Sequence, residues 1–284
     1  VMLCAHMDEV GLMVRRITDE GYLKFDAVGA LDRRVLLGKP VRVSPKGIPG
    51  VWGLKAYHLV SREEEKSVPK LDEFYIDIGA KDKAGAEALV NLGDAAAFAS
   101  TAGEFGSGLF QGKALGSRVG CAVLLTLLKE ELPLDCTFVF TAQEEVGNRG
   151  AFGAGFSVTP ELALVLDGAD TADAPGVPAH KRGCTLGKGV VLPVMDRGSI
   201  VDRGLFERLR TLAERENIRW QTRGSIPGRT DAAALQRTKA GVRTAMLSVP
   251  VRYHHTPSGL VSLGDVDGML ALTRAFLSDL AEKE

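Results

Sequence analysis

The feature that most constrains the fold is an alternation of short apolar runs with amphipathic stretches from about residue 112 onward. The runs predicted to be strands lie at 137–141, 163–166 and 244–249. Apolar residues recur every three or four positions in three predicted helices, at 117–132, 202–217 and 266–280. Such alternation is typical of βαβ units, in which helices cover a mostly parallel sheet. The apolar run 1–5 suits a further strand, so we expect an α/β fold.

Residues 11–106 show a different sequence pattern. Its β-like runs are short and are separated by glycine and proline, as in a small all-β barrel or sandwich. We therefore expect a β-rich domain at 11–106, inserted into an α/β catalytic domain formed by 1–10 and 107–284. A domain rarely begins directly with a buried core strand, so we also expect that a native N-terminal segment precedes residue 1.

Composition excludes several classes of function. The 284 residues contain 35 Lys+Arg and 36 Asp+Glu, so the net charge is −1 and no basic surplus indicates nucleic acid or an anionic membrane as partner. No apolar run reaches the roughly 18–20 residues that a membrane span needs. The four cysteines form no CxxC pair, which is typical of a reducing compartment, and we expect the cytoplasm.

A histidine or a carboxylate follows each of four predicted strands. These side chains are His6, Asp8 and Glu9, then Glu144 and Glu145, then Asp167, and finally His254 and His255. Any one of them alone is more often structural, but open α/β sheets place their sites at the carboxyl ends of strands. Imidazole with carboxylate is the ligand set of a zinc-type site that retains water. The pattern therefore predicts a metal centre.

The adjacent carboxylates Glu144 and Glu145 point in different directions, so one can bind metal while the other faces the substrate. A glutamate beside the attacking water is the usual general base of metal-assisted hydrolysis. Asp8 lies two residues from His6 and can hydrogen-bond its imidazole, which would fix the tautomer.

Six ordered motifs resemble those of the M42 metallo-aminopeptidases, the glutamyl and tetrahedral aminopeptidase group that is sometimes labelled endoglucanase. They are AHMDEVG (5–11), GKALGSRVGC (112–121), TAQEEVGNRGA (141–151), LDGADTADAPG (166–176), GRTDAAA (228–234) and VPVRYHHTP (249–257). The resemblance implies a two-metal site, with zinc or cobalt, on the α/β domain. It also implies that the β domain mediates dimerisation, often within a dodecamer.

The resemblance further assigns roles to individual residues. It makes Glu144 the general base and Asp8 the residue that orients a ligand. It makes four residues metal ligands, in two pairs: His6 with Asp167, and Glu145 with His255. The second histidine of the HH pair is the one that aligns, so His254 is not expected to be a ligand.

One motif departs from the family. Where the family has an aspartate that bridges both metals, this chain has Gly116, and Ser117 replaces a second aspartate. This loss removes one negative charge and two ligand oxygens from between two cations, so their repulsion is largely unscreened. A single metal held by the four remaining ligands, or no metal, are therefore alternatives to a two-metal site.

Three functions remain open from the sequence. The first is a metal-dependent aminopeptidase that removes N-terminal residues from peptides and is impaired by Gly116. The second is an inactive homologue with a scaffolding or regulatory role, and the third is hydrolysis of small N-acyl amides. Gly116 favours the second, whereas retention of the base and all four outer ligands favours the first.

Overall fold

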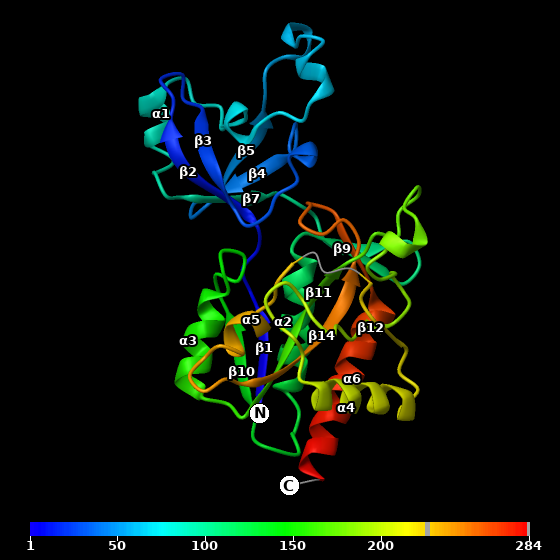
Figure 1. The fold of residues 1–284 in the computed structure, drawn as a ribbon. Coiled ribbons are helices and arrows are strands. Elements are labelled where there is room, and N and C mark those ends of the chain that lie inside the picture. The colour runs from blue at the N-terminus through cyan, green and yellow to red at the C-terminus, as the bar shows by residue number, and fades with distance from the viewer. Residues whose placement is uncertain (225–227, 283–284) are drawn as a thin grey trace. The chain divides into compact units, whose positions relative to one another are not determined.

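The computed structural model describes residues 1–224 and 228–282. The chain forms two compact units (Figure 1). Unit 1 comprises Val1–Asp8, Ala102–His254 and Ser258–Glu284, and unit 2 comprises Glu9–Thr101 with His255–Pro257. Each unit has its own hydrophobic core.

Unit 1 is built on a six-stranded sheet. Its strands, in spatial order, are β10 (Thr137–Thr141), β1 (Met2–His6), β11 (Leu162–Asp170), β14 (Arg243–Val251), β12 (Val190–Val191) and β13 (Trp220–Gln221). The first four run parallel, whereas β12 pairs antiparallel with β14. Although β1 opens the chain, it is paired on both sides (Figure 1), which explains why all five of its residues are buried. The predicted α/β class with a mostly parallel sheet is confirmed.

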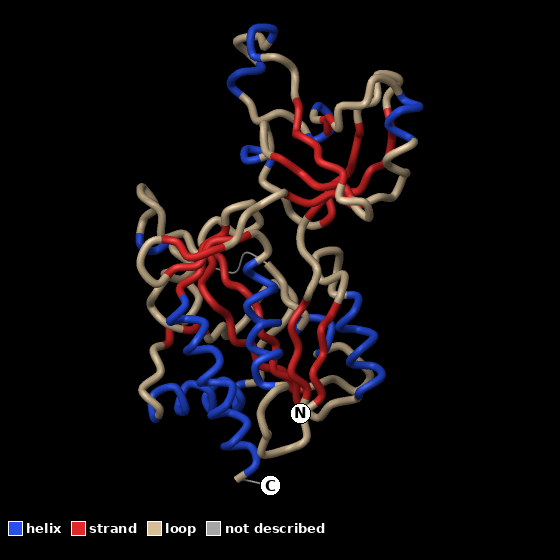
Figure 2. Tube along the Cα trace, turned by 180° about the vertical axis from the view of Figure 1, so that it is seen from behind, coloured by secondary structure: helices blue, strands red, loops and turns tan. Residues whose placement is uncertain are grey.

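Helices cover both faces of this sheet (Figure 2). They are α2 (Leu115–Leu127), α3 (Arg149–Val158), α4 (Arg203–Arg215), α5 (Ala232–Leu235) and α6 (Leu263–Ala281). Neighbouring residues of a strand point to opposite faces. The Cys4 thiol meets Asp231 at the start of α5, whereas the Ala5 methyl group faces Gly120 of α2. Helices α5 and α2 therefore pack on opposite faces of β1.

Glycines let α2 approach β11 closely. A Cβ at Gly120 would lie 2.5 Å from the Leu166 carbonyl oxygen, and a Cβ at Gly168 would lie 2.6 Å from the Cα of Gly116. Neither position has room for a side chain. The first turn of α2 therefore lies directly beside the residue that follows Asp167.

Strand β11 and helix α2 differ most from the sequence expectation. Strand β11 continues through Asp167 to Asp170 because it stays paired with β14 along its whole length. Helix α2 ends at Leu127, since the amides of Lys129 and Glu130 bond to carbonyls only three residues back. Asp167 is therefore part of a strand and does not follow one.

A three-stranded antiparallel sheet also belongs to unit 1. It contains β15 (Gly259–Ser262), β9 (Leu109–Gly112) and β8 (Gly103–Phe105). Unit 2 is a closed barrel of β2 (Gly11–Ile17), β3 (Leu23–Val28), β6 (Tyr75–Asp77), β5 (Ile48–Gly53), β4 (Pro40–Val43) and β7 (Ala95–Phe98), with the short helix α1 (Lys83–Glu87). Strand β7 closes the barrel by pairing with both β2 and β4. Single 3-10 turns occur at Arg33–Val35, Tyr57–Leu59, Glu64–Lys66, Leu71–Glu73 and Ala179–Lys181.

An aromatic cluster fills the barrel. The Trp52 ring packs edge-on against Phe25 and Phe74, with centroid distances of 4.9 and 6.1 Å, and stacks on Phe98 at 6.0 Å. All four side chains are buried. Alternation along β3, β5 and β7 sends Phe25, Trp52 and Phe98 inward, so the barrel has a core of its own.

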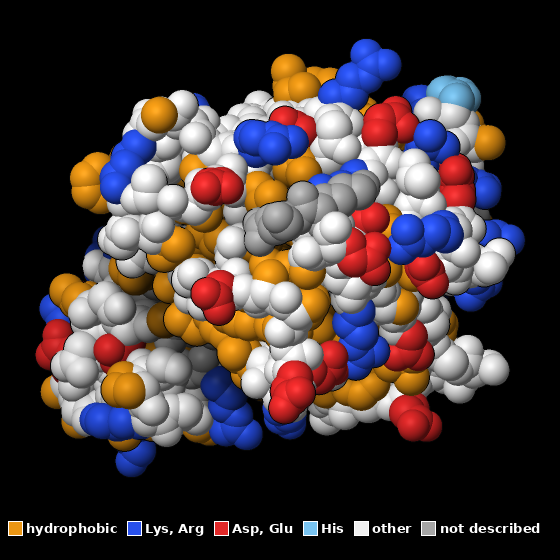
Figure 3. Space-filling model, turned by 90° about the horizontal axis from the view of Figure 1, so that it is seen from below, with side chains coloured by type: hydrophobic (Ala, Val, Ile, Leu, Met, Phe, Trp, Pro, Cys, Tyr) orange, Lys and Arg blue, Asp and Glu red, His pale blue; other side chains and the backbone are white. Residues whose placement is uncertain are grey.

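Within the described residues, no helix is both long and apolar enough to cross a membrane. Figure 3 shows basic and acidic side chains interspersed over the face that it draws. This mixture agrees with the net charge of −1.

Candidate metal centre

Three neighbouring strands bring the expected site residues of unit 1 together. His6 is the last residue of β1, Glu144 and Glu145 lie in the turn after β10, and Asp167 lies in β11. In the parallel register, His6 pairs with Thr141 and Cys4 with Val165. Two residues farther along these neighbouring strands, His6 lies beside Asp167. The distance from His6 Nε2 to Asp167 Oδ1 is 3.5 Å.

His6, Glu144 and Glu145 each offer one ligand atom, and these atoms lie within 4.8 Å of one another. His6 and Asp167 are buried, and the two glutamates are half-buried. Atoms that bind zinc at about 2.0–2.3 Å must lie only a few Å apart. Nitrogen and carboxylate oxygen at this spacing make a donor set that fits a divalent metal ion.

Asp8 contacts both His6 and the turn that carries Glu144 and Glu145. Its Oδ1 lies 3.3 Å from His6 Nδ1 and accepts a hydrogen bond from the Glu144 amide at 3.1 Å, and its Oδ2 accepts from the Glu145 amide at 3.2 Å. Burial opposes ionisation, but these hydrogen bonds hold the pKa of Asp8 below its ordinary value. Asp8 can therefore orient both the imidazole and the Glu144–Glu145 turn.

The cluster holds more negative charge than its one imidazole can balance. Burial and the charge of Asp167 raise the pKa of Glu144, and burial raises the pKa of Glu145 to about 7 against the charges of His6 and His254. Burial disfavours a charged His6, but hydrogen bonds to Asp167 and Asp8 outweigh it and raise the pKa of His6 to about 11. Burial is the main cause of both glutamate shifts, and a nearby cation would favour the charged carboxylates. This electrostatics also fits a metal ion.

A buried polar layer, to which no sequence pattern gives a role, lies under the cluster. Asp231 is 1% exposed, accepts a hydrogen bond from the Thr141 hydroxyl, and has a pKa that burial raises. Asn148 Nδ2 donates to Glu144 Oε1 at 2.8 Å and to Asp231 Oδ1 at 3.4 Å. Asp231 is in a quoted motif, but nothing in its spacing shows that the fold would place it beneath Glu144.

The backbone around the turn is strained. Gln143 and Asn148 have φ values of 62° and 56°, in the left-handed region that non-glycine residues seldom adopt. They bracket Glu144 and Glu145. Strain of this kind is often found where a fold fixes functional side chains.

His254 occupies the space beside Gly116. Its Nδ1 lies 2.7 Å from Asp170 Oδ1, and a Cβ built at Gly116 would lie only 2.1 Å from its Nε2. The imidazole thus fills the position where a side chain at residue 116 would begin. Ser117 is buried, and its hydroxyl donates to the Ala114 carbonyl at 3.1 Å, within the first turn of α2.

The remaining expected ligand, His255, belongs to the segment His255–Pro257 of unit 2. It has a φ of 58°. Its role as a ligand stays a prediction.

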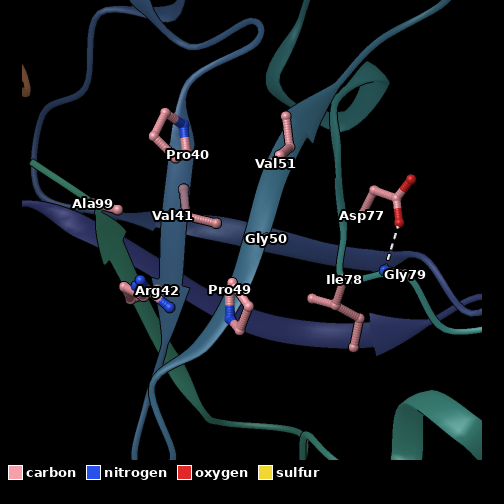
Figure 4. Close-up of a pocket in the computed structure, with 10 residues that line it drawn as sticks. All are labelled: Pro40, Val41, Arg42, Pro49, Gly50, Val51, Asp77, Ile78, Gly79 and Ala99. Atoms are coloured by element: carbon pink, nitrogen blue, oxygen red, sulfur yellow. Dashed lines mark hydrogen bonds between the residues drawn. The ribbon is translucent and has the colours of Figure 1, made fainter.

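A pocket on the barrel provides a contrast (Figure 4). It is lined mainly by apolar and glycine residues of β4, β5 and the segment after β6, and its charged lining residues are Arg42 and Asp77. The Asp77 carboxylate accepts a hydrogen bond from the Gly79 amide at 2.8 Å (Figure 4). A lining with one carboxylate and one arginine is a poor ligand set for a metal.

Comparisons with known proteins agree with the geometry. The model of the M42 glutamyl aminopeptidase family matches residues 1–272. The lysyl aminopeptidase of Pyrococcus furiosus is 33% identical over 288 residues, which cover 99% of this chain and 82% of that protein. The structure of an aminopeptidase from the archaeon Desulfurococcus kamchatkensis aligns with a TM-score of 0.91 and 35% identity, over 97% of this chain and 78% of that one.

The Pyrococcus horikoshii TET1 peptidase, which can assemble into a tetrahedron or a large octahedral shell, aligns with a TM-score of 0.84 and 35% identity. The alignment covers 97% of this chain and 82% of that one. The family model and these relatives span the barrel as well as the parallel sheet. The chain therefore belongs to the M42 family of aminopeptidases, and its enzyme class is that of a hydrolase.

Proposed function

We propose that this aminopeptidase cleaves the N-terminal residue from peptides at the cluster of His6, Glu144, Glu145 and Asp167, with a divalent metal as cofactor. One observation carries the proposal: the ends of β1 and β10 bring ligand atoms of an imidazole and two glutamates within 4.8 Å of one another, and β11 places Asp167 beside His6. Zinc and cobalt both suit this donor set.

His6, Glu145 and Asp167 would hold the metal, and the family resemblance adds His255 to the expected ligands. A bound metal supplies Lewis acidity, which polarises the carbonyl of the scissile amide. The chain's own residues fix its ligands, because Asp8 contacts His6 and both amides of the Glu144–Glu145 turn.

Glu144 acts as the general base. Its carboxylate takes a proton from the attacking water, and the water oxygen adds to the carbonyl carbon. The protonated Glu144 then gives the proton to the leaving amine as the C–N bond breaks. Asn148 orients the carboxylate through a hydrogen bond of 2.8 Å. The raised pKa of Glu144 suits a group that must both accept and release a proton.

Two further proposals concern assembly and location. We propose that the protein self-associates, because a similar peptidase assembles into closed shells. We place it in the cytoplasm, because none of the four cysteines forms a disulfide.

Glu144→Gln tests the proposal, with Glu161→Gln as a matched control on the surface. Protein dialysed against zinc or cobalt is assayed for metal per chain and for turnover of aminoacyl-p-nitroanilides. Loss of the base is expected to lower kcat by about 10²–10⁴-fold while metal content is unchanged. Full turnover by Glu144→Gln would refute the assigned role. A metal-loaded wild type without turnover would indicate an inactive homologue instead.

A further inference from the structure

Asp231 is a buried carboxylate beneath the proposed general base, and only 1% of the residue is exposed. The Thr141 hydroxyl donates a hydrogen bond to its Oδ2 at 2.5 Å, and Asn148 Nδ2 donates to its Oδ1 at 3.4 Å. Taking a carboxylate out of water is costly, and even a paired buried charge adds little to stability. Stability is therefore a poor reason for a carboxylate at this position, whereas its contact with Asn148 indicates a role in the site.

Asn148 connects Asp231 to Glu144. The residue is 2% exposed, and its Nδ2 donates to Glu144 Oε1 at 2.8 Å as well as to Asp231 Oδ1. A primary amide carries two protons on its nitrogen, so each carboxylate accepts one of them. If the amide turned over, its carbonyl oxygen would face an oxygen of each carboxylate, and an ionised carboxylate has no proton to donate. The two carboxylates together therefore fix which way the amide points.

The backbone holds this amide close to Glu144. Asn148 has a φ of 56°, a left-handed conformation that asparagine tolerates better than most residues. The backbone amides of Gly147 and Asn148 both donate to the Glu144 carbonyl at 3.0 Å. Although Asn148 is the N-cap residue of α3, its side chain makes no capping hydrogen bond to the described helix. Its side-chain amide therefore serves the two carboxylates and not the helix.

The orientation of this amide matters for proton transfer. Glu144 takes a proton from the attacking water and is then a carboxylic acid, with one of its two oxygens protonated. A freely turning amide could offer its own oxygen to that proton and hold it away from the leaving amine. With Asp231 in place, the amide keeps its N–H toward Oε1. The proton then resides on Oε2 and passes from there to the leaving amine as the C–N bond breaks.

We propose that Asp231 is a positioning residue of this peptidase, which fixes the Asn148 amide so that Glu144 Oε1 accepts a hydrogen bond throughout and Oε2 carries the proton. This inference rests on the proposed function, in which Glu144 is the general base. It deepens that function, because it adds a residue that acts on the reaction through Asn148.

The test measures kcat, KM and metal content of the zinc- or cobalt-loaded protein. Asp231→Asn keeps the side-chain volume, but its own NH2 can turn toward a flipped Asn148. We therefore expect kcat to fall by about 10–100-fold, the usual effect of losing an outer partner, with KM and metal per chain unchanged. Asn148→Gly removes the amide and is expected to lower kcat by a similar factor, while glycine readily adopts a φ of 56°.

The double variant separates positioning from a structural effect. If Asp231 acts through Asn148, Asp231→Asn lowers kcat in the wild type but causes no further loss in the Asn148→Gly background. Equal losses in both backgrounds would overturn the inference, because a structural or direct electrostatic effect does not need the amide. Asp265→Asn is the matched control, since Asp265 is also fully buried and accepts hydrogen bonds from two backbone amides. It is expected to lower Tm and to leave kcat unchanged.

The inference and the proposed function can fail separately. An unchanged kcat in Asp231→Asn or in Asn148→Gly would overturn the positioning role, while an inactive Glu144→Gln variant would still support the general base. Full turnover by Glu144→Gln would remove the base itself, and with it both proposals.

Discussion

Gly116→Ala is expected to destabilise unit 1 by about 2 kcal/mol, although alanine is the better helix former. The new methyl carbon would lie 2.1 Å from Nε2 of His254 and 3.0 Å from both adjacent ring carbons. Overpacking of this kind costs roughly 1–3 kcal/mol. Moving the ring away also loses its charge-assisted hydrogen bond to Asp170, worth about 1.5–3 kcal/mol. Because the His254 side chain is 20% exposed, the ring has a path outward, and the smaller total is expected.

The same substitution should behave differently without the imidazole. In a His254→Ala background the clash is gone, and replacing a helical glycine stabilises by about 0.5–1 kcal/mol. The coupling between the two positions is therefore about 2.5–3 kcal/mol, near the upper end of what contacting residues show. In a unit of this size, 2 kcal/mol corresponds to a shift of roughly 4–8 °C in Tm.

The assay is thermal unfolding of the wild type, both single variants and the double variant. Equal effects of Gly116→Ala with and without His254 would refute the placement of the ring. The argument extends to restoring the carboxylate. Gly116→Asp alone meets the same ring, so it should be tolerated only together with His254→Ala.

The remaining predictions concern acid stability, the barrel and metal content. Arg252 and the Leu186 amide, against the effect of burial, lower the pKa of Asp173 to about 2 from 3.8, so its stabilisation is full above pH 4 and is lost as the pH falls through 2. Asp173→Asn should therefore lower the free energy of unfolding by about 2 kcal/mol at pH 7. It should also reduce the loss of this free energy between about pH 4 and pH 2, as measured by urea unfolding. Trp52→Ala should cost unit 2 about 3–5 kcal/mol, leaving the fluorescence midpoint of Trp220 in unit 1 unchanged. Metal analysis should find one ion per chain, not two.

Much of the fold follows from patterns that the sequence displays directly. Strand β10 coincides with the predicted run at 137–141, because its flanking turns and apolar character are local properties. The end of β11 was predicted wrongly at 166, since a carboxylate at 167 looks like the start of a loop. Pairing with β14 and cover from α2 keep that segment extended, and no local pattern reports those partners.

The buried polar layer under the cluster could not be predicted from local sequence patterns either. Asp231 lies 87 positions from Glu144 in the chain, and Asn148 joins the two side chains only after α3 and α5 have packed. Spacing identifies residues that share one strand end or one helix face. It does not identify a buried carboxylate that reaches a site from the start of another helix.

The expectation of one ion per chain follows from the charge of the ligand set. Glu145 and Asp167 supply two negative charges, His6 supplies none when neutral, and Glu144 is reserved for proton transfer. Two charges balance one divalent cation, whereas a second ion nearby would face repulsion that a bridging carboxylate normally offsets. Gly116 supplies neither the donor atoms nor the negative charge of the family's aspartate. Its presence therefore makes a second ion unfavourable. Two ions per chain at micromolar free zinc would refute this reasoning, because other residues would then have to supply the negative charge that balances the second ion.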